Sequence, residues 1–329
     1  MAYLEVDTKA GGLRHFLGQW LREAQLRGCT EEIFRRQTLI YVCIYALILA
    51  VAPMFAFAGF EISLPQIVAL LAVVAFSQAI AVYYMKRHND PFVSNIIAGT
   101  TQLAVISIIC ILYSYVAMRF NFPLVDEQLH KADVFLGFDW HSYKDVLLQS
   151  EESTFFALLC YALLDLQVVS ACICAVLFLK FREYQIFVLA FMISALLVLF
   201  ISIFTPAYAT FHYYGVVEEM AKRLALNSGY VHISQLDAIR AGLPFAPAEH
   251  MSGIIAFPSF HACGGLLFAW MFWQIPYFRV AMVPMNICMI MVTPIVGGHY
   301  FVDVIAGVMV GLAVITATHY AVMKNVKRQ

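Results

Sequence analysis

Apolar residues fall in long runs along this chain, and short segments rich in polar residues, proline or glycine separate the runs. A helix needs about 20 residues to cross the hydrocarbon core of a bilayer. We therefore predict an all-α protein, a polytopic membrane helical bundle of about eight transmembrane helices. The predicted helices cover Thr38–Ala58, Leu64–Met85, Ser94–Met118, Thr154–Leu179, Gln185–Thr205, Pro258–Pro276, Val280–Gly297 and Tyr300–Met323.

Two long polar segments, residues 119–153 and 206–257, connect these helices on the same side of the membrane. In the first, apolar residues such as Leu129 are mixed with acidic ones, which indicates an amphipathic helix that lies on the membrane face or caps the bundle. The second contains a predicted short helix that ends at Asn227–Gly229. We expect both segments to fold over one end of the bundle.

Composition supports a membrane protein and argues against a soluble domain, a nucleic-acid-binding protein and a disulfide-rich or metal-binding fold. Hydrophobic residues make up 62% of the 329 and charged residues 12%, whereas a soluble domain has roughly 45–50% and 25%. The formal net charge of -1 gives no reason to expect a nucleic-acid partner. The eight cysteines include no CxxC pair, so we expect no metal site and no disulfide framework.

Positive charges predict the orientation of the bundle. When the N-terminus is placed in the cytoplasm, most of the 20 Lys and Arg residues fall in cytoplasmic segments, as the positive-inside rule requires. Residues 1–37 and 324–329 are then cytoplasmic tails of a multi-pass protein. The two long polar loops face the periplasm or lumen, and we expect a bacterial inner membrane. The oligomeric state is left open.

Two histidines enter the predicted bundle from that outer side. His261 lies in "AFPSFHACGG" at the start of the sixth span, and His299 lies in "GGHYFVDVIAG" at the start of the eighth. One helical hairpin separates these starts, so both side chains return to the same membrane depth. Titratable groups at membrane depth are costly and mark functional sites. We therefore predict a site where the two histidines meet.

The residues around the histidines favour phosphoryl transfer. Asp303 follows His299 by one helical turn, so its carboxylate can hold one ring nitrogen and leave the other as a nucleophile. Ser259 caps a helix whose free N–H groups form an anion site, and His261 can donate a proton to a leaving oxygen. Gly298 permits close backbone approach beside His299. A buried pair that holds helices together, or the proton relay of a transporter, remain the alternatives.

At these residues the chain resembles the type 2 phosphatidic acid phosphatase superfamily. The motif Pro-Ser-Gly-His appears as "PSFH", with Phe260 in place of Gly. The motif Ser-Arg-x5-His-x3-Asp matches at His299 and Asp303, while Val292 and Thr293 occupy the Ser and Arg positions. The first motif, Lys-x6-Arg-Pro, is not found. "FPSFHA", "GGHYFVDVIAG" and "LGFDW" look more like the branch of inositol phosphorylceramide synthase and its bacterial relatives.

The resemblance implies a six-helix phosphatase-like core over residues 94–323, preceded by two additional helices within residues 38–93. It implies a lipid-phosphate phosphatase or head-group phosphotransferase that needs neither metal nor cofactor. The expected partners are a membrane lipid phosphate and the bilayer. A phosphosphingolipid synthase and, from another class, a proton-coupled transporter are the alternative functions.

The resemblance also implies a role for each matched residue. His299 is the expected nucleophile, Asp303 orients it, and His261 acts as general acid and then as general base. Ser259 is expected to help bind phosphate. Gly298 matches no motif residue, and we expect it to bind phosphate through the close backbone approach that it permits.

The family cations that neutralise phosphate have no match in this chain. Positive side chains on the outer side are the available substitutes. We predict that Lys222 and Arg223 take this role, because they lie in the loop that leads to "FPSFH".

Overall fold

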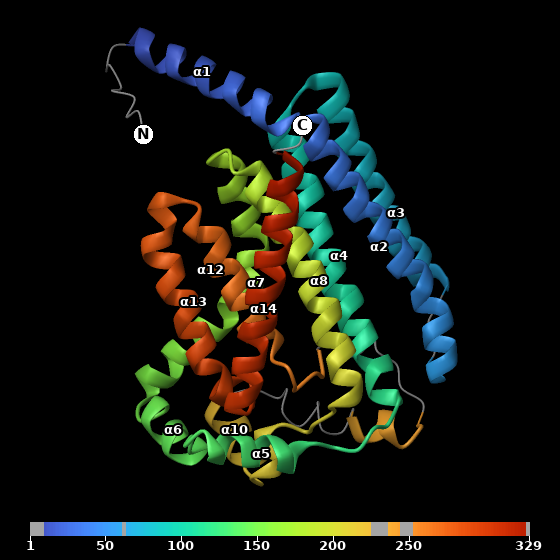
Figure 1. Cartoon of the computed structure of the whole chain (residues 1–329), viewed down its shortest axis with the longest axis vertical. Coiled ribbons are helices and arrows are strands. Elements are labelled where there is room, and N and C mark those ends of the chain that lie inside the picture. The colour runs from blue at the N-terminus through green and yellow to red at the C-terminus, as the bar shows by residue number, and fades with distance from the viewer. Residues whose placement is uncertain (1–9, 61–63, 225–235, 244–252, 327–329) are drawn as a thin grey trace.

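The computed structural model describes residues 10–60, 64–224, 236–243 and 253–326, and the regular elements in these ranges are all helices (Figure 1). This confirms the predicted all-α class. The elements are α1 (Ala10–Gly28), α2 (Glu31–Ala58), α3 (Leu64–Tyr83), the π-helical turn η1 (Tyr84–His88), α4 (Pro91–Arg119), α5 (Asp126–Phe135), α6 (Trp140–Leu147), α7 (Glu151–Leu177), α8 (Phe181–Phe204), α9 (Thr210–Tyr213), α10 (Val217–Leu224), α12 (Phe260–Trp273), α13 (Pro276–Val296) and α14 (Phe301–Val326).

Each predicted span appears as a helix, and seven helices of the described ranges are long and apolar enough to cross a membrane. The sixth predicted span, α12, has 14 residues and is shorter than expected. Ser259 caps its start, and its C-cap Gln274 is followed closely by Pro276, the first residue of α13. Proline is favoured at the first position of a helix, so the turn and the next helix begin early.

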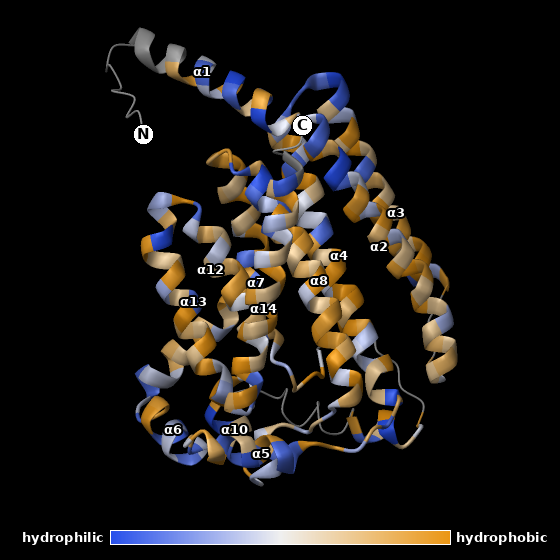
Figure 2. Cartoon of the chain, in the orientation of Figure 1, coloured by the Kyte–Doolittle hydropathy of each residue, from blue (hydrophilic) through white to orange (hydrophobic). Residues whose placement is uncertain are grey.

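Many large apolar side chains of the long helices are exposed. The hydropathy colouring shows that these helices are apolar along most of their length (Figure 2). Phe76 on α3 is 71% exposed and Met309 on α14 is 64% exposed. Long apolar helices with exposed side chains of this kind are typical of a membrane-embedded protein. The chain is therefore an integral multi-pass membrane protein.

The bundle has a centre and a peripheral pair. Helix α12 packs against α13 and α14, while α8 packs against α4 and α14. Helices α2 and α3 pack on α4 at the edge of the bundle, away from α12 and α13 (Figure 1). The predicted N-terminal tail contains the helix α1. This helix lies across one end of the bundle, where Trp20 stacks on Phe92 of α4 (Figure 1).

The two ends of the bundle differ. The start of α2 and the end of α14 lie at one end, and the short helices α5, α6 and α10 lie across the other (Figure 1). Helices α5 and α6 confirm that the first polar loop contains helix. That its helix is amphipathic and lies on the membrane face stays a prediction. Helices α9 and α10 lie in the second loop, whose predicted helix end at Asn227–Gly229 falls outside the described residues. The short helices therefore cover the end at which α12 and α14 begin.

Candidate active site

The structure brings His299 and Asp303 together at the start of α14. The Nδ1 atom of His299 lies 3.3 Å from Oδ2 of Asp303. The same carboxylate oxygen accepts the backbone N–H of Tyr300 at 2.9 Å. Both side chains are shielded from solvent, with 5% exposure for His299 and none for Asp303. The Asp303 carboxylate thus binds Nδ1 of His299 and thereby fixes the orientation of the imidazole.

The start of α12 lies directly against α14. The Ser259 hydroxyl accepts the N–H of Ala262 at 3.4 Å, and the Ser259 N–H donates to the backbone carbonyl of Asp303 at 3.0 Å. A Cβ atom at Gly307 would lie 2.1 Å from the Ser259 carbonyl oxygen. The absence of a side chain at Gly307 therefore permits the close approach that places His261 beside α14.

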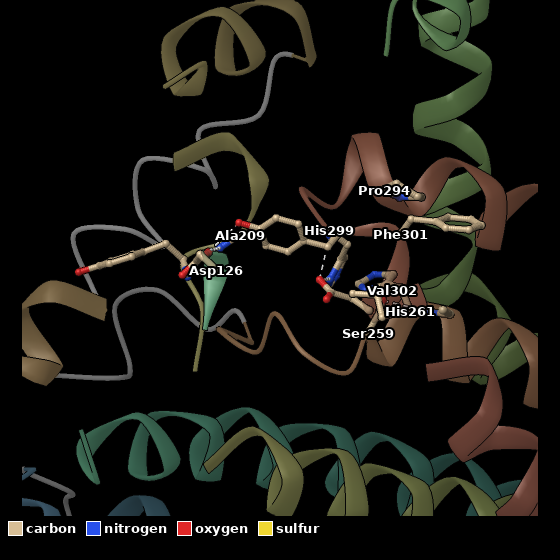
Figure 3. Close-up of polar contacts among 12 residues, drawn as sticks. Asp126, Ala209, Ser259, His261, Pro294, His299, Phe301 and Val302 are labelled. Atoms are coloured by element: carbon tan, nitrogen blue, oxygen red, sulfur yellow. Dashed lines mark hydrogen bonds and ion pairs between the residues drawn. The ribbon is translucent and has the colours of Figure 1, made fainter. Parts of the chain in front are cut away.

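His261 lies against Tyr161 of α7. The two rings stack with centroids 4.1 Å apart and planes 13° apart, and the Tyr161 hydroxyl lies 3.1 Å from His261 Nδ1. A Cβ atom at Gly297 would lie 2.8 Å from both the Tyr161 hydroxyl and Cδ2 of His299. The two imidazoles therefore border one small volume (Figure 3). Within the described part of the chain, no hydrogen bond engages either Nε2 atom.

Gly298 has a backbone conformation that favours glycine. Its φ of +68° lies in the left-handed region, and its carbonyl accepts the N–H of Thr210 at 2.8 Å. The neighbouring Ala209 also has a positive φ, 79°. Positive φ is uncommon for a residue with a side chain and persists where the surroundings hold it. Asp126 supplies that support, because its carboxylate accepts the N–H of Ala209 at 3.1 Å.

Two carboxylates of α5 support the site, and sequence reasoning missed both. Asp133 accepts the N–H groups of Phe301 and Val302 at 2.8 Å each and so caps α14. Asp126 accepts the hydroxyl of Tyr300 at 3.0 Å (Figure 3). Burial raises the pKa of Asp133, while the two N–H donors oppose this rise. A surface helix thereby positions the segment that carries His299.

The sequence contains a signal for this support. Asp126, Leu129 and Asp133 follow one another at helical spacing, and all three are buried. Positions three and seven residues apart share one face of a helix. Carboxylates on the same stripe as a buried leucine indicate that this face meets polar backbone groups of another element.

Lys222 and Arg223 do not join the histidines. They line a cavity of about 600 Å³ with the first turns of α7, including Thr154 and Leu158. The Arg223 guanidinium donates to the carbonyl of Leu148. Among the described residues that line this cavity, neither histidine is present. The predicted phosphate role of these two cations is thus not supported by a contact with the site.

The other outer-side cations are engaged elsewhere. They are bound as follows: Arg119 by the Ile239 carbonyl, Lys131 by Glu127, Lys144 by Glu219 and Arg240 by the Phe122 carbonyl. At the family's Arg position, the Thr293 hydroxyl donates to the Met289 carbonyl at 2.7 Å. Over the described ranges, no group of three or more His, Cys, Asp or Glu residues is placed to hold a metal ion. Independence of metal stays a prediction.

Comparison with known families adds to this geometry. The chain matches the PAP2 superfamily over residues 127–317, an interval that runs from the second residue of α5 into α14 and includes both histidines and Asp303. The chain belongs to the PAP2 superfamily. No curated protein and no solved structure matches it. PAP2 proteins are typically metal-independent phosphatases or phosphotransferases, which supports the predicted enzyme class. The match does not distinguish the inositol phosphorylceramide synthase branch, which stays a prediction.

Proposed function

We propose that the protein transfers the phosphoryl group of a membrane lipid phosphate through a phosphohistidine on His299. The observation that carries the proposal is the pairing of the two imidazoles at one end of a membrane bundle. Each has Nδ1 bound by a partner, Asp303 for His299 and Tyr161 for His261. Each therefore offers Nε2 to a substrate.

The reaction has two balanced steps. In the first, the Nε2 lone pair of His299 attacks phosphorus, the bond from phosphorus to the lipid oxygen breaks, and His261 gives its Nε2 proton to that oxygen. In the second, the oxygen of an acceptor hydroxyl attacks the phosphorus of the phosphohistidine, and Nε2 of His261 takes the proton of that hydroxyl. The bond from phosphorus to His299 then breaks and the nitrogen lone pair is restored. Asp303 stabilises the positive charge that His299 carries between the steps.

The phosphate is expected at the start of α12. Helix N-termini bind anions through free N–H groups and the helix dipole. Asp133 already occupies the N–H groups of Phe301 and Val302 at the start of α14. The start of α12 after Ser259 and the left-handed backbone at Gly298 therefore remain as the phosphate-binding elements.

The acceptor decides the product. Water makes the protein a phosphatase, and a lipid or sugar hydroxyl makes it a head-group phosphotransferase. A phosphosphingolipid synthase is the second candidate, favoured by the similarity of "FPSFHA" and "GGHYFVDVIAG" to that branch. PAP2 membership favours both over a proton-coupled transporter.

The test uses purified protein in detergent. A panel of lipid phosphates labelled with ³²P is offered alone or with a diacylglycerol or ceramide acceptor, and free phosphate, new lipid products and acid-labile label on the protein are measured. His299→Asn should abolish all three signals. The matched control is His141→Asn at an exposed position of α6, which should retain them. Turnover or labelling that survives in His299→Asn would refute the proposed nucleophile.

A further inference from the structure

We infer that Tyr161 is a positioning residue for His261 and presents Nε2 of that imidazole to the leaving oxygen. The inference rests on the proposed function, because it concerns the general acid of that reaction. Tyr161 belongs to neither superfamily motif that this chain matches. It lies on α7, 100 positions before His261 in the sequence.

Two contacts fix the His261 ring. Stacking on Tyr161, with planes 13° apart, restricts rotation of the imidazole out of its plane. The hydroxyl at 3.1 Å from Nδ1 distinguishes the two flipped orientations, since a flipped ring would put carbon in place of nitrogen. Together they determine where Nε2 lies.

The position of the hydroxyl connects Tyr161 to the reaction. A Cβ atom added at Gly297 would lie 2.8 Å from the Tyr161 hydroxyl and equally close to Cδ2 of His299. The hydroxyl therefore borders the space in which the two histidines meet.

A hydroxyl is a better hydrogen-bond partner than a carboxylate for a histidine that acts as general acid. For His261 to act as general acid and then as general base, its Nδ1 must keep a proton that the Tyr161 oxygen accepts, while the Nε2 proton leaves and returns. A carboxylate partner, such as Asp303 beside His299, stabilises a positively charged imidazole strongly. A neutral hydroxyl stabilises it less, so His261 gives up its proton more readily. The two histidines thus have different partners that match their different roles.

Asp165 favours this direction of the hydrogen bond. It lies one turn further along α7 and interacts electrostatically with Tyr161. If the Tyr161 hydroxyl donates its hydrogen toward Asp165, its oxygen lone pairs are left for the Nδ1–H of His261. Asp165 is an acidic residue within a membrane-spanning helix and shares one helix face with Tyr161.

Tyr161→Phe tests the inference, because it keeps the stacking and removes only the hydroxyl. The matched control is Tyr113→Phe on α4, which removes a hydroxyl that donates to the Leu47 carbonyl at 2.8 Å. Two substrates are compared: a lipid phosphate, whose alkoxide leaving group needs a proton, and nitrophenyl phosphate, whose leaving group does not. For nitrophenyl phosphate the pre-steady-state burst is measured, and its amplitude counts the folded sites.

We expect Tyr161→Phe to lower kcat on the lipid phosphate roughly 10-fold to 100-fold, the cost of an unpartnered buried nitrogen. The burst rate per folded site should change little, and Tyr113→Phe should affect the two substrates alike. In a His261→Ala background, Tyr161→Phe should cause no further loss on the lipid phosphate.

The outcomes separate the inference from the proposed function. If the unaltered protein turns over neither substrate, the proposed function fails. If it turns over both and Tyr161→Phe shows equal losses on the two substrates, or no loss, Tyr161 does not position the general acid. A full additional loss from Tyr161→Phe in the His261→Ala background would overturn the inference as well.

Discussion

The carboxylate of Asp133 accepts the backbone N–H of Phe301 at 2.8 Å, at the first residue of α14. Its second oxygen accepts the next N–H, that of Val302, at the same distance. A surface helix from one polar loop therefore caps the helix that carries Asp303. Any motion of α5 relative to α14 must break these bonds, so the position of His299 depends on the short helices across this end of the bundle.

The cap at Asp133 should be measurable. Replacing a capping carboxylate by alanine leaves backbone N–H groups unsatisfied and costs about 0.5–2 kcal/mol. We expect Asp133→Ala to lower the free energy of unfolding in detergent by that amount and to reduce kcat. The control on the same helix is Glu127→Ala, an exposed residue whose ion pair with Lys131 contributes little. Equal thermal midpoints and equal kcat for the two variants would contradict the capping role.

His299 and Asp303 should be unequal in their contributions. His299→Ala removes the nucleophile and should abolish turnover, while Asp303→Ala should reduce it on the order of 10⁴-fold, by analogy with other orienting carboxylates. Phosphate release measures the first effect, and the rate of ³²P labelling of the protein measures the second. Near-normal turnover in Asp303→Ala would remove its orienting role and leave the nucleophile in place.

Chelation should not inactivate the enzyme. The proposed steps use histidine, a carboxylate and a helix N-terminus, and none of them requires a metal ion. We expect turnover to persist in EDTA without added magnesium. Loss of activity in chelator that a divalent ion restores would require a different mechanism.

The close approach at Gly307 gives a steric prediction. A methyl group there would lie 2.1 Å from the Ser259 carbonyl oxygen, so Gly307→Ala must push the start of α12 away from α14. We expect a lower thermal midpoint and a large loss of turnover. Gly253→Ala is the control, because its Cβ atom would meet nothing within 4 Å. A Gly307→Ala protein with normal turnover would show that the spacing of these helices is not critical.

Backbone strain at Ala209 gives a prediction of the opposite sign. With φ 79° and ψ 168°, the residue occupies a region that is essentially restricted to glycine and costs about 1–3 kcal/mol. Ala209→Gly should therefore raise the thermal midpoint, and Ala209→Val should lower it. The nearby Ala207→Gly, at a buried position without positive φ, should lower it too. A fall in the midpoint with Ala209→Gly would show that the strain is not relieved at this residue.

The sequence by itself determined the features that depend on short stretches of chain. Runs of apolar residues predicted where helices span the membrane, since each run must satisfy its backbone hydrogen bonds internally in lipid. The pairing of His299 with Asp303 also follows from local geometry, because residues four apart share one face of a helix. The length of α12 departed from the prediction, because the hydrophobicity of a run does not specify where its cap and its turn fall.

The tertiary structure decided what joins distant segments. Asp133 reaches Phe301 across 168 positions, and Tyr161 reaches His261 across 100. Such contacts depend on how helices pack and rotate against one another, and no periodicity along one helix specifies its neighbour. Helix packing, which closeness along the chain does not specify, also determines the surroundings of Lys222 and Arg223. Closeness to "FPSFH" along the chain suggested the phosphate site, whereas packing placed both cations against the first turns of α7.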